Sequence, residues 1–94
     1  MKESLQQHIH ILATHVWIGK AGLTDSVIAE IRKHAEKKPL VKIKLLAAAL
    51  VGKEKKQFAE DISKRTGCKL IQQRGNVLIL QGRVSLERYK AMSR

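Results

Sequence analysis

The spacing of hydrophobic residues along the chain predicts an α/β protein whose elements follow the order αβαβαββ. The pattern begins with a stripe at helical spacing, made of Leu5, Ile9, Leu12 and Ala13. This stripe predicts a first helix over roughly residues 3–13. Residues 15–18 are partly β-branched and are closed by Gly19, which predicts a strand with Trp17 pointing away from its two hydrophobic neighbours.

A second helix is predicted from Thr24 to about Lys38. Thr24 is a favourable N-cap residue, Asp25 suits the positive end of the helix dipole, and Pro39 prevents continuation. The expected buried stripe of this helix comprises Val27, Ile28, Ile31 and Ala35. Residues 40–45 then alternate between hydrophobic residues and lysines, which predicts a half-covered strand. A strand–helix–strand unit of this length normally forms a right-handed crossover in which the two strands are parallel.

The second half of the chain predicts one more helix and a hairpin. The helix is clear over residues 53–66, whereas residues 47–51 fit a loop, a strand extension or a first helical turn. Strands are predicted over residues 69–73 and 77–80, joined by a turn at residues 74–76. The last strand is the most hydrophobic, so we expect it inside the sheet and antiparallel to its hairpin partner.

The charge balance points to a polyanionic partner. Nineteen Lys and Arg against eight Asp and Glu give a net charge of +11, and the excess is spread over the predicted elements. Only three aromatic residues of the Phe, Trp and Tyr class are present, so contacts to phosphates should dominate over base stacking. The longest apolar run, residues 45–51, is far shorter than the ~20 residues of a membrane span. The amino end does not resemble a signal peptide, so a cytoplasmic protein without a membrane partner is expected.

The motif that carries most weight is Gly19-Lys20-Ala21-Gly22, between a predicted strand and a capped helix. Glycines let a backbone approach a ligand closely, amides at a helix N-terminus favour an anion, and Lys20 adds a positive charge. The spacing alone favours a tight strand-to-helix turn that requires glycine dihedral angles over a phosphate contact. The net charge of the chain favours a contact to nucleic-acid phosphate.

These residues resemble the CRM domain, a YhbY-like RNA-binding module. The resemblance covers roughly residues 5–81. Its pieces are His10 with Leu12, the segment 18–24, Glu30-Ile31, the segment 40–44, Thr66-Gly67, the segment 70–72, Gly75 and the segment 77–80. It implies a mixed four-stranded sheet with helices packed on it, similar to the C-terminal domain of bacterial translation initiation factor three.

The resemblance also implies binding of structured RNA. Bacterial single-domain members are associated with precursors of the large ribosomal subunit, and this chain looks like one of them. We therefore expect one CRM-type domain over residues 1–94, with its core at about 5–81 and a basic, loose tail at 82–94. Precursor ribosomal RNA is the expected partner, with no cofactor and no small-molecule substrate.

Two groups of basic residues are expected to extend the RNA surface beyond the glycine motif. Arg32 and Lys33 lie on the second predicted helix. Lys42, Lys44 and Arg74 form a second candidate patch on and beside the predicted strands. Trp17 either stacks on a base beside these lysines or covers the sheet or a protein partner.

The sequence offers no constellation for catalysis or for a metal, so a non-enzymatic protein is expected. His8 and His10 point to different faces of a helix, and neither they nor His15 have cysteine or acidic partners that complete a metal site. Glu60 and Asp61 are adjacent, which places them about 100° apart on a helix. The single cysteine, Cys68, follows Arg65 and precedes Lys69, but a small buried side chain is favoured over an activated thiolate.

The sequence therefore favours an RNA-binding module that recognises folded RNA in assembly of the large ribosomal subunit. An architectural protein that coats duplex nucleic acid in the manner of small chromatin proteins is the alternative. A protein-interaction subunit with a basic docking surface is a third option, because charge alone does not identify the polyanion.

Overall fold

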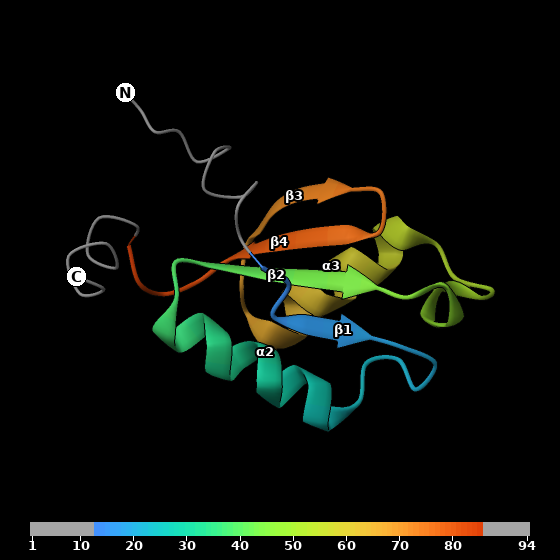
Figure 1. Ribbon diagram of the computed structural model, residues 1–94, viewed down its shortest axis with the longest axis horizontal. Helices are drawn as coiled ribbons and strands as arrows, with labels where there is room; N and C mark the ends of the chain where they lie inside the picture. Colours follow the sequence, from blue (N-terminus) through green and yellow to red (C-terminus); the bar gives the residue numbers. More distant parts are fainter. Residues whose placement is uncertain (1–12, 86–94) are drawn as a thin grey trace.

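The computed structural model describes residues 13–85, which form one sheet with two α-helices (Figure 1). The elements are β1 (Val16–Ile18), α2 (Asp25–Lys37), β2 (Leu40–Leu45), the 3₁₀ helix η1 (Ala47–Leu50), α3 (Lys55–Thr66), β3 (Leu70–Arg74) and β4 (Val77–Gln81). The helix predicted over 3–13 lies outside the described residues, apart from Ala13, which is not helical. From the first strand onward the order of strands and α-helices is the predicted one.

The four strands form a mixed sheet in the spatial order β1-β2-β4-β3. β1 and β2 are parallel, while β4 is antiparallel to both β2 and β3. The prediction that the most hydrophobic strand lies inside the sheet is confirmed. As a result, β1 and β2 end at the same edge of the sheet as the turn between β3 and β4 (Figure 1).

The capping signals around α2 behave as the sequence predicts. The Thr24 hydroxyl accepts a hydrogen bond of 3.1 Å from the backbone N–H of Val27, which satisfies one of the free amides of the first turn. The helix ends at Lys37, directly before the extended residue Lys38 and the buried Pro39. Ile28, Ile31 and Ala35 are buried, and Val27 packs against the core from its edge.

Both α-helices contribute to one hydrophobic core on one face of the sheet. The fully buried large side chains of this core are Val16, Ile18, Ile31, Val41, Ile43, Leu45, Ile62, Leu78 and Leu80. Burial of each such side chain stabilises the fold by roughly 1.5–3 kcal/mol. The opposite face carries a second cluster in which Leu40 and Ile79 are buried and Ile71 and Val77 are partly buried.

The segment between β2 and α3 resolves the alternatives that the sequence leaves open. Residues Ala47–Leu50 form a 3₁₀ helix that is separate from α3. The predicted start of α3 at Lys53 is two residues too early, because Gly52 has a φ of +73° and Glu54 is extended. The inner face of α3 is formed as predicted by Phe58, Ala59 and Ile62.

The hairpin starts and turns one residue later than predicted. β3 begins at Leu70 rather than at residue 69, and Arg74 belongs to the strand, so the turn consists of Gly75 and Asn76 alone. A positive φ at Gly75 and none at Asn76 is the pattern of a two-residue type II′ turn. The strand also contains an irregularity between Leu70 and Gln72 that period-two reasoning does not reveal.

The prediction of a loose tail from residue 82 is wrong for its first two residues. The backbone N–H of Gly82 donates to the carbonyl of Pro39 at 2.6 Å, and that of Arg83 donates to the carbonyl of Ala35 at 2.8 Å. A Cβ atom on Gly82 would lie 1.7 Å from the carbonyl oxygen of Lys38. The chain after β4 is therefore packed tightly onto the end of α2, and only a glycine fits at residue 82.

Candidate nucleic-acid interface

The glycine motif forms a tight turn that connects β1 to α2. The backbone N–H of Gly22 donates a hydrogen bond of 2.9 Å to the carbonyl of Gly19, which makes Lys20 and Ala21 the two central residues of the turn. Both central residues are exposed. Among the described residues only glycines have a positive φ, so Ala21 does not adopt the conformation of a type II turn. The Lys20 side chain is thus carried at the tip of a short, closed loop.

The two glycines of this loop have different structural requirements. Gly22 is buried and has a φ of +73°, a conformation that other residues rarely adopt. Gly19 has no positive φ, and a Cβ atom there would lie 3.7 Å from the Leu46 side chain, an ordinary contact. The turn therefore requires a glycine at residue 22, and any need for one at residue 19 must come from a ligand.

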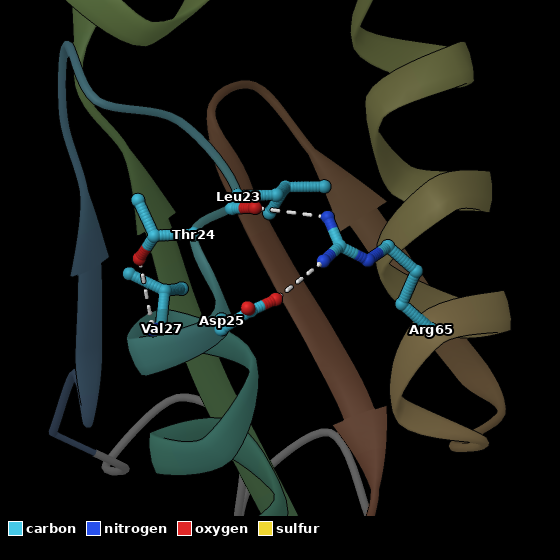
Figure 2. Close-up of polar contacts among 5 residues, drawn as sticks. All are labelled: Leu23, Thr24, Asp25, Val27 and Arg65. Atoms are coloured by element: carbon cyan, nitrogen blue, oxygen red, sulfur yellow. Dashed lines mark hydrogen bonds and ion pairs between the residues drawn. The ribbon is translucent and has the colours of Figure 1, made fainter.

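The side chain of Arg65 on α3 is hydrogen-bonded to the residues that directly follow the glycine loop (Figure 2). One terminal nitrogen of its guanidinium donates to the carbonyl of Leu23 at 2.8 Å, and the other donates to Asp25 Oδ1 at 3.3 Å. The pair with Asp25 is exposed and contributes little on its own. The bond to the Leu23 carbonyl joins residues 42 positions apart and fixes the backbone directly after Gly22. The sequence gives no local sign of this contact, because it depends on how the two helices pack.

The strand register gathers three of the predicted site residues at the edge of the sheet where the glycine loop lies. Trp17 is paired with Lys44 across the parallel strands, and Lys44 is paired with Val77. Val77 is in turn paired with Arg74. Paired residues share a face of the sheet, so these four form one row across all four strands, on the face opposite α2 and α3. Lys20 follows Trp17 by three residues and lies in the turn directly after β1.

Trp17 is exposed over 56% of its surface in the described structure. It lies on β1, one of the two edge strands, directly beside the exposed Lys44. An exposed ring next to a cation is suited to stacking on a nucleic-acid base. The same exposed ring also fits contact with a protein surface, the alternative that the sequence leaves open.

Lys42 lies two residues before Lys44 on β2 and shares its face of the sheet. The backbone of Lys42 is hydrogen-bonded to His15. The backbone of residue 42 and His15 exchange two hydrogen bonds: Lys42 N–H donates to His15 Nδ1 at 3.0 Å, and His15 N–H donates to the Lys42 carbonyl at 2.8 Å. Partial burial, the His34 ring at 5.1 Å, and the charges of Lys38 and Lys42 lower the pKa of His15 to about 4. His15 is therefore neutral at pH 7, with Nδ1 occupied as an acceptor.

Arg32 and Lys33 are exposed on α2 but lie apart from this edge. The helix starts near the glycine loop and runs back along the sheet, so both residues lie about two turns from its beginning (Figure 1). Because they are consecutive, their side chains project about 100° apart. They extend the basic surface along the helix layer without joining the row on the sheet.

Comparisons with known proteins identify the domain. The sequence profile of the CRS1/YhbY (CRM) domain matches residues 1–80. The chain belongs to this family. A Methanocaldococcus jannaschii protein named as a probable RNA-binding protein is 32% identical over 80 residues, which is 85% of this chain and 59% of that protein. This CRM domain thus spans about three-fifths of the length of that relative.

A solved structure supports the same assignment at the level of the fold. The solution structure of a Staphylococcus aureus hypothetical protein, proposed to bind RNA, matches with a TM-score of 0.67 and 26% identity. The match covers 86% of this chain and 82% of the other. The α/β fold with a mixed four-stranded sheet, expected from the resemblance, is confirmed.

Cys68 and the histidines are the remaining candidates for chemistry in this CRM domain. Cys68 is buried and free, and its backbone N–H is bonded to the hydroxyl of the fully buried Thr66 at 3.3 Å, as the packing interpretation expects. Within residues 13–85 no group of three His, Cys, Asp or Glu side chains is placed to hold a metal ion. His8 and His10 lie outside the described residues. No described helix is long and apolar enough to cross a membrane.

Proposed function

We propose that this CRM domain binds structured RNA through the edge of the sheet at which the glycine loop lies, and that it acts in assembly of the large ribosomal subunit. The observation that carries the proposal is the convergence at one edge of Lys20, Lys44, Arg74 and the exposed ring of Trp17. These residues come from three separate parts of the sequence, because Trp17 and Lys20 belong to one segment. A net charge of +11 supplies the general attraction for a polyanion.

The contact that each residue of this surface makes follows from the chemistry of its side chain. Lys20 contacts a phosphate from the tip of the closed turn, where Lys20 and Ala21 are exposed and allow close approach. Lys44 and Arg74 contact further phosphates along the row, and Lys42 lies two residues before Lys44 on the same face. Trp17 stacks on an unpaired base. Arg32 and Lys33 widen the basic surface around the helix layer. Such contacts favour folded RNA in which backbone and unpaired bases lie close together.

Membership in the family and the descriptions of both relatives support RNA as the polyanion. The test is a competition measurement with a labelled structured RNA, in which unlabelled folded RNA and unlabelled duplex DNA of equal length are the competitors. We expect RNA to compete much better than DNA. Equal competition would favour the architectural duplex binder, and binding to neither would favour a protein-docking role.

The ribosomal part of the proposal is tested separately in cells. The tagged domain should sediment with precursors of the large subunit and should crosslink to their RNA, and Lys20→Glu should reduce both. Lys64→Glu is the matched control, because Lys64 is exposed on α3 and belongs to neither the glycine loop nor the row on the sheet. Crosslinks to unrelated RNA alone would contradict the ribosomal assignment and leave RNA binding in place.

A further inference from the structure

A cavity of about 650 Å³ lies between the glycine loop and α3, on the other side of the loop from Trp17. One wall is formed by Ala21, Gly22 and Leu23, and the other by one side of α3 together with the residues that precede it. The volume lies within the roughly 300–1,000 Å³ that is usual for small-ligand sites. Lys20 directly precedes Ala21 in the cavity wall, so a nucleotide whose phosphate lies at Lys20 has its nucleoside near this cavity.

The charges around the cavity indicate a neutral occupant. Lys53 and Arg65 line it together with Glu54 and Asp61, two positive groups and two negative ones. Such a lining is poorly suited to a phosphate, in contrast to the lysine at the tip of the adjacent turn. The cavity thus fits the neutral part of a nucleotide, the base.

The Asp61 carboxylate is a hydrogen-bond acceptor on the α3 wall of the cavity. Asp61 Oδ1 accepts a hydrogen bond of 3.1 Å from Gln57 Nε2, which holds the carboxylate in place. A carboxylate has capacity for about four hydrogen bonds, so further acceptor positions remain on Asp61. Arg65 is bonded to the Leu23 carbonyl and to Asp25 rather than to Asp61. The buried ring of Phe58, with the Lys53 ammonium 5.8 Å from its centre, adds an apolar surface.

We propose that this cavity binds an unpaired guanine base of the RNA, with its Watson–Crick edge on the Asp61 carboxylate. Guanine presents two adjacent donors, N1–H and the exocyclic N2 amine, which match the two oxygens of one carboxylate; uracil presents a single N–H on that edge. The inference rests on the proposed function, because it takes the phosphate of the same nucleotide to lie at Lys20. It adds a base preference that charge alone does not give.

The test uses three RNA hairpins that differ only in one unpaired nucleotide: guanosine, inosine, which lacks the exocyclic amine, or uridine. For the wild-type chain we expect about tenfold tighter binding of the guanosine hairpin than of the uridine hairpin, the size of one good bidentate base contact. Inosine should fall between them. The ratio of affinities is the measured quantity, since it cancels the general electrostatic attraction.

Asp61→Asn should abolish the guanosine preference, whereas Glu60→Gln should retain it. Both substitutions remove one negative charge from neighbouring positions of α3, and the exposed Glu60 is not part of the cavity lining. Both should therefore strengthen binding of the uridine hairpin to a similar extent, and only Asp61→Asn should lose the additional affinity for the guanosine hairpin. Thermal unfolding of both variants verifies that the fold is intact.

The outcomes separate the inference from the proposed function. Equal affinity of the wild-type chain for the guanosine and uridine hairpins would overturn the guanine site, and the same preference in Asp61→Asn and Glu60→Gln would overturn the role of Asp61. Loss of binding in Lys20→Glu would still support the RNA surface in either case. Guanosine monophosphate should not displace the hairpin at concentrations at which unlabelled hairpin does; equal displacement would contradict RNA as the source of the base.

Discussion

The Arg65 guanidinium donates a 2.8 Å hydrogen bond to the carbonyl of Leu23, and so holds the backbone that follows the glycine loop against α3. The contact connects α3 to the loop that carries Lys20 (Figure 2). It also forms part of the wall of the cavity beside that turn. The position of the candidate phosphate contact therefore depends on a residue that is not itself proposed to contact a phosphate.

Arg65→Ala is expected to weaken RNA binding more than Lys64→Ala. Both remove one positive charge from the last turn of α3, but only Arg65 holds the Leu23 carbonyl. The unfolding free energy should fall by about 1 kcal/mol in Arg65→Ala, the size of a typical net hydrogen bond. Arg65→Lys retains the charge and loses the paired geometry, so it should restore only part of the affinity. Full restoration by lysine would mean that Arg65 acts through charge alone.

Gly22→Ala and Gly19→Ala should distinguish a glycine that is required for folding from one that is required for RNA binding. At Gly22 the φ of +73° should cost an alanine roughly 1–2 kcal/mol of stability. At Gly19 the contact distance of 3.7 Å leaves room for a methyl group, so the melting temperature should remain close to that of the wild type. If RNA approaches the backbone there, Gly19→Ala should nevertheless weaken binding. Unchanged binding in a normally folded Gly19→Ala would identify the motif as a turn alone.

The lowered pKa of His15 predicts a pH dependence of folding. The pKa is about 4 in the folded chain and about 6.5 in the unfolded chain, so below pH 6.5 the unfolded state binds a proton that the folded state does not. The His15 contribution to stability is thus complete above pH 6.5 and is lost as the pH falls towards 4. His15→Asn retains an acceptor for the Lys42 N–H and should flatten this part of the profile in chemical unfolding experiments. The same slope in both proteins would show that other groups cause it.

Gly82→Ala should destabilise the fold strongly, although the sequence places this residue in a basic tail. The added Cβ atom would meet the backbone of Lys38, which cannot move aside as a flexible side chain can. We expect a clear fall in the melting temperature, whereas Arg83→Ala, at the next position, is exposed and retains its backbone N–H, so it should have little effect. A wild-type melting temperature for Gly82→Ala would contradict the packing of this segment onto α2.

The sequence predicts the elements that depend on local chemistry. The cap at Thr24, the stop at Pro39 and the alternation over residues 40–45 are local signals, and the structure confirms each. The start of α3 and the length of the hairpin turn differ because backbone conformations at Gly52, Glu54 and Gly75 decide them. Hydrophobic periodicity does not report those conformations.

The candidate site is predictable only in part, because tertiary packing assembles it. The glycine motif, Lys44 and Arg74 are recognisable as basic or flexible positions, but only the strand register shows that they lie at one edge. Gly82, Arg65 and the cavity beside the glycine loop have no signal in the sequence, since each depends on contacts between distant segments. Their roles follow from the structure alone.

The central claim is that the glycine loop contacts phosphate as part of a largely ionic RNA surface. The most direct test is the dependence of RNA affinity on salt for the wild-type chain, Lys20→Ala and Lys64→Ala. About four to six phosphate contacts predict a slope of log affinity against log salt of roughly −3 to −5 for the wild type. Lys20→Ala should flatten that slope by about one contact and Lys64→Ala should leave it nearly unchanged. A nearly flat wild-type slope, or identical slopes for the two variants, would contradict the claim.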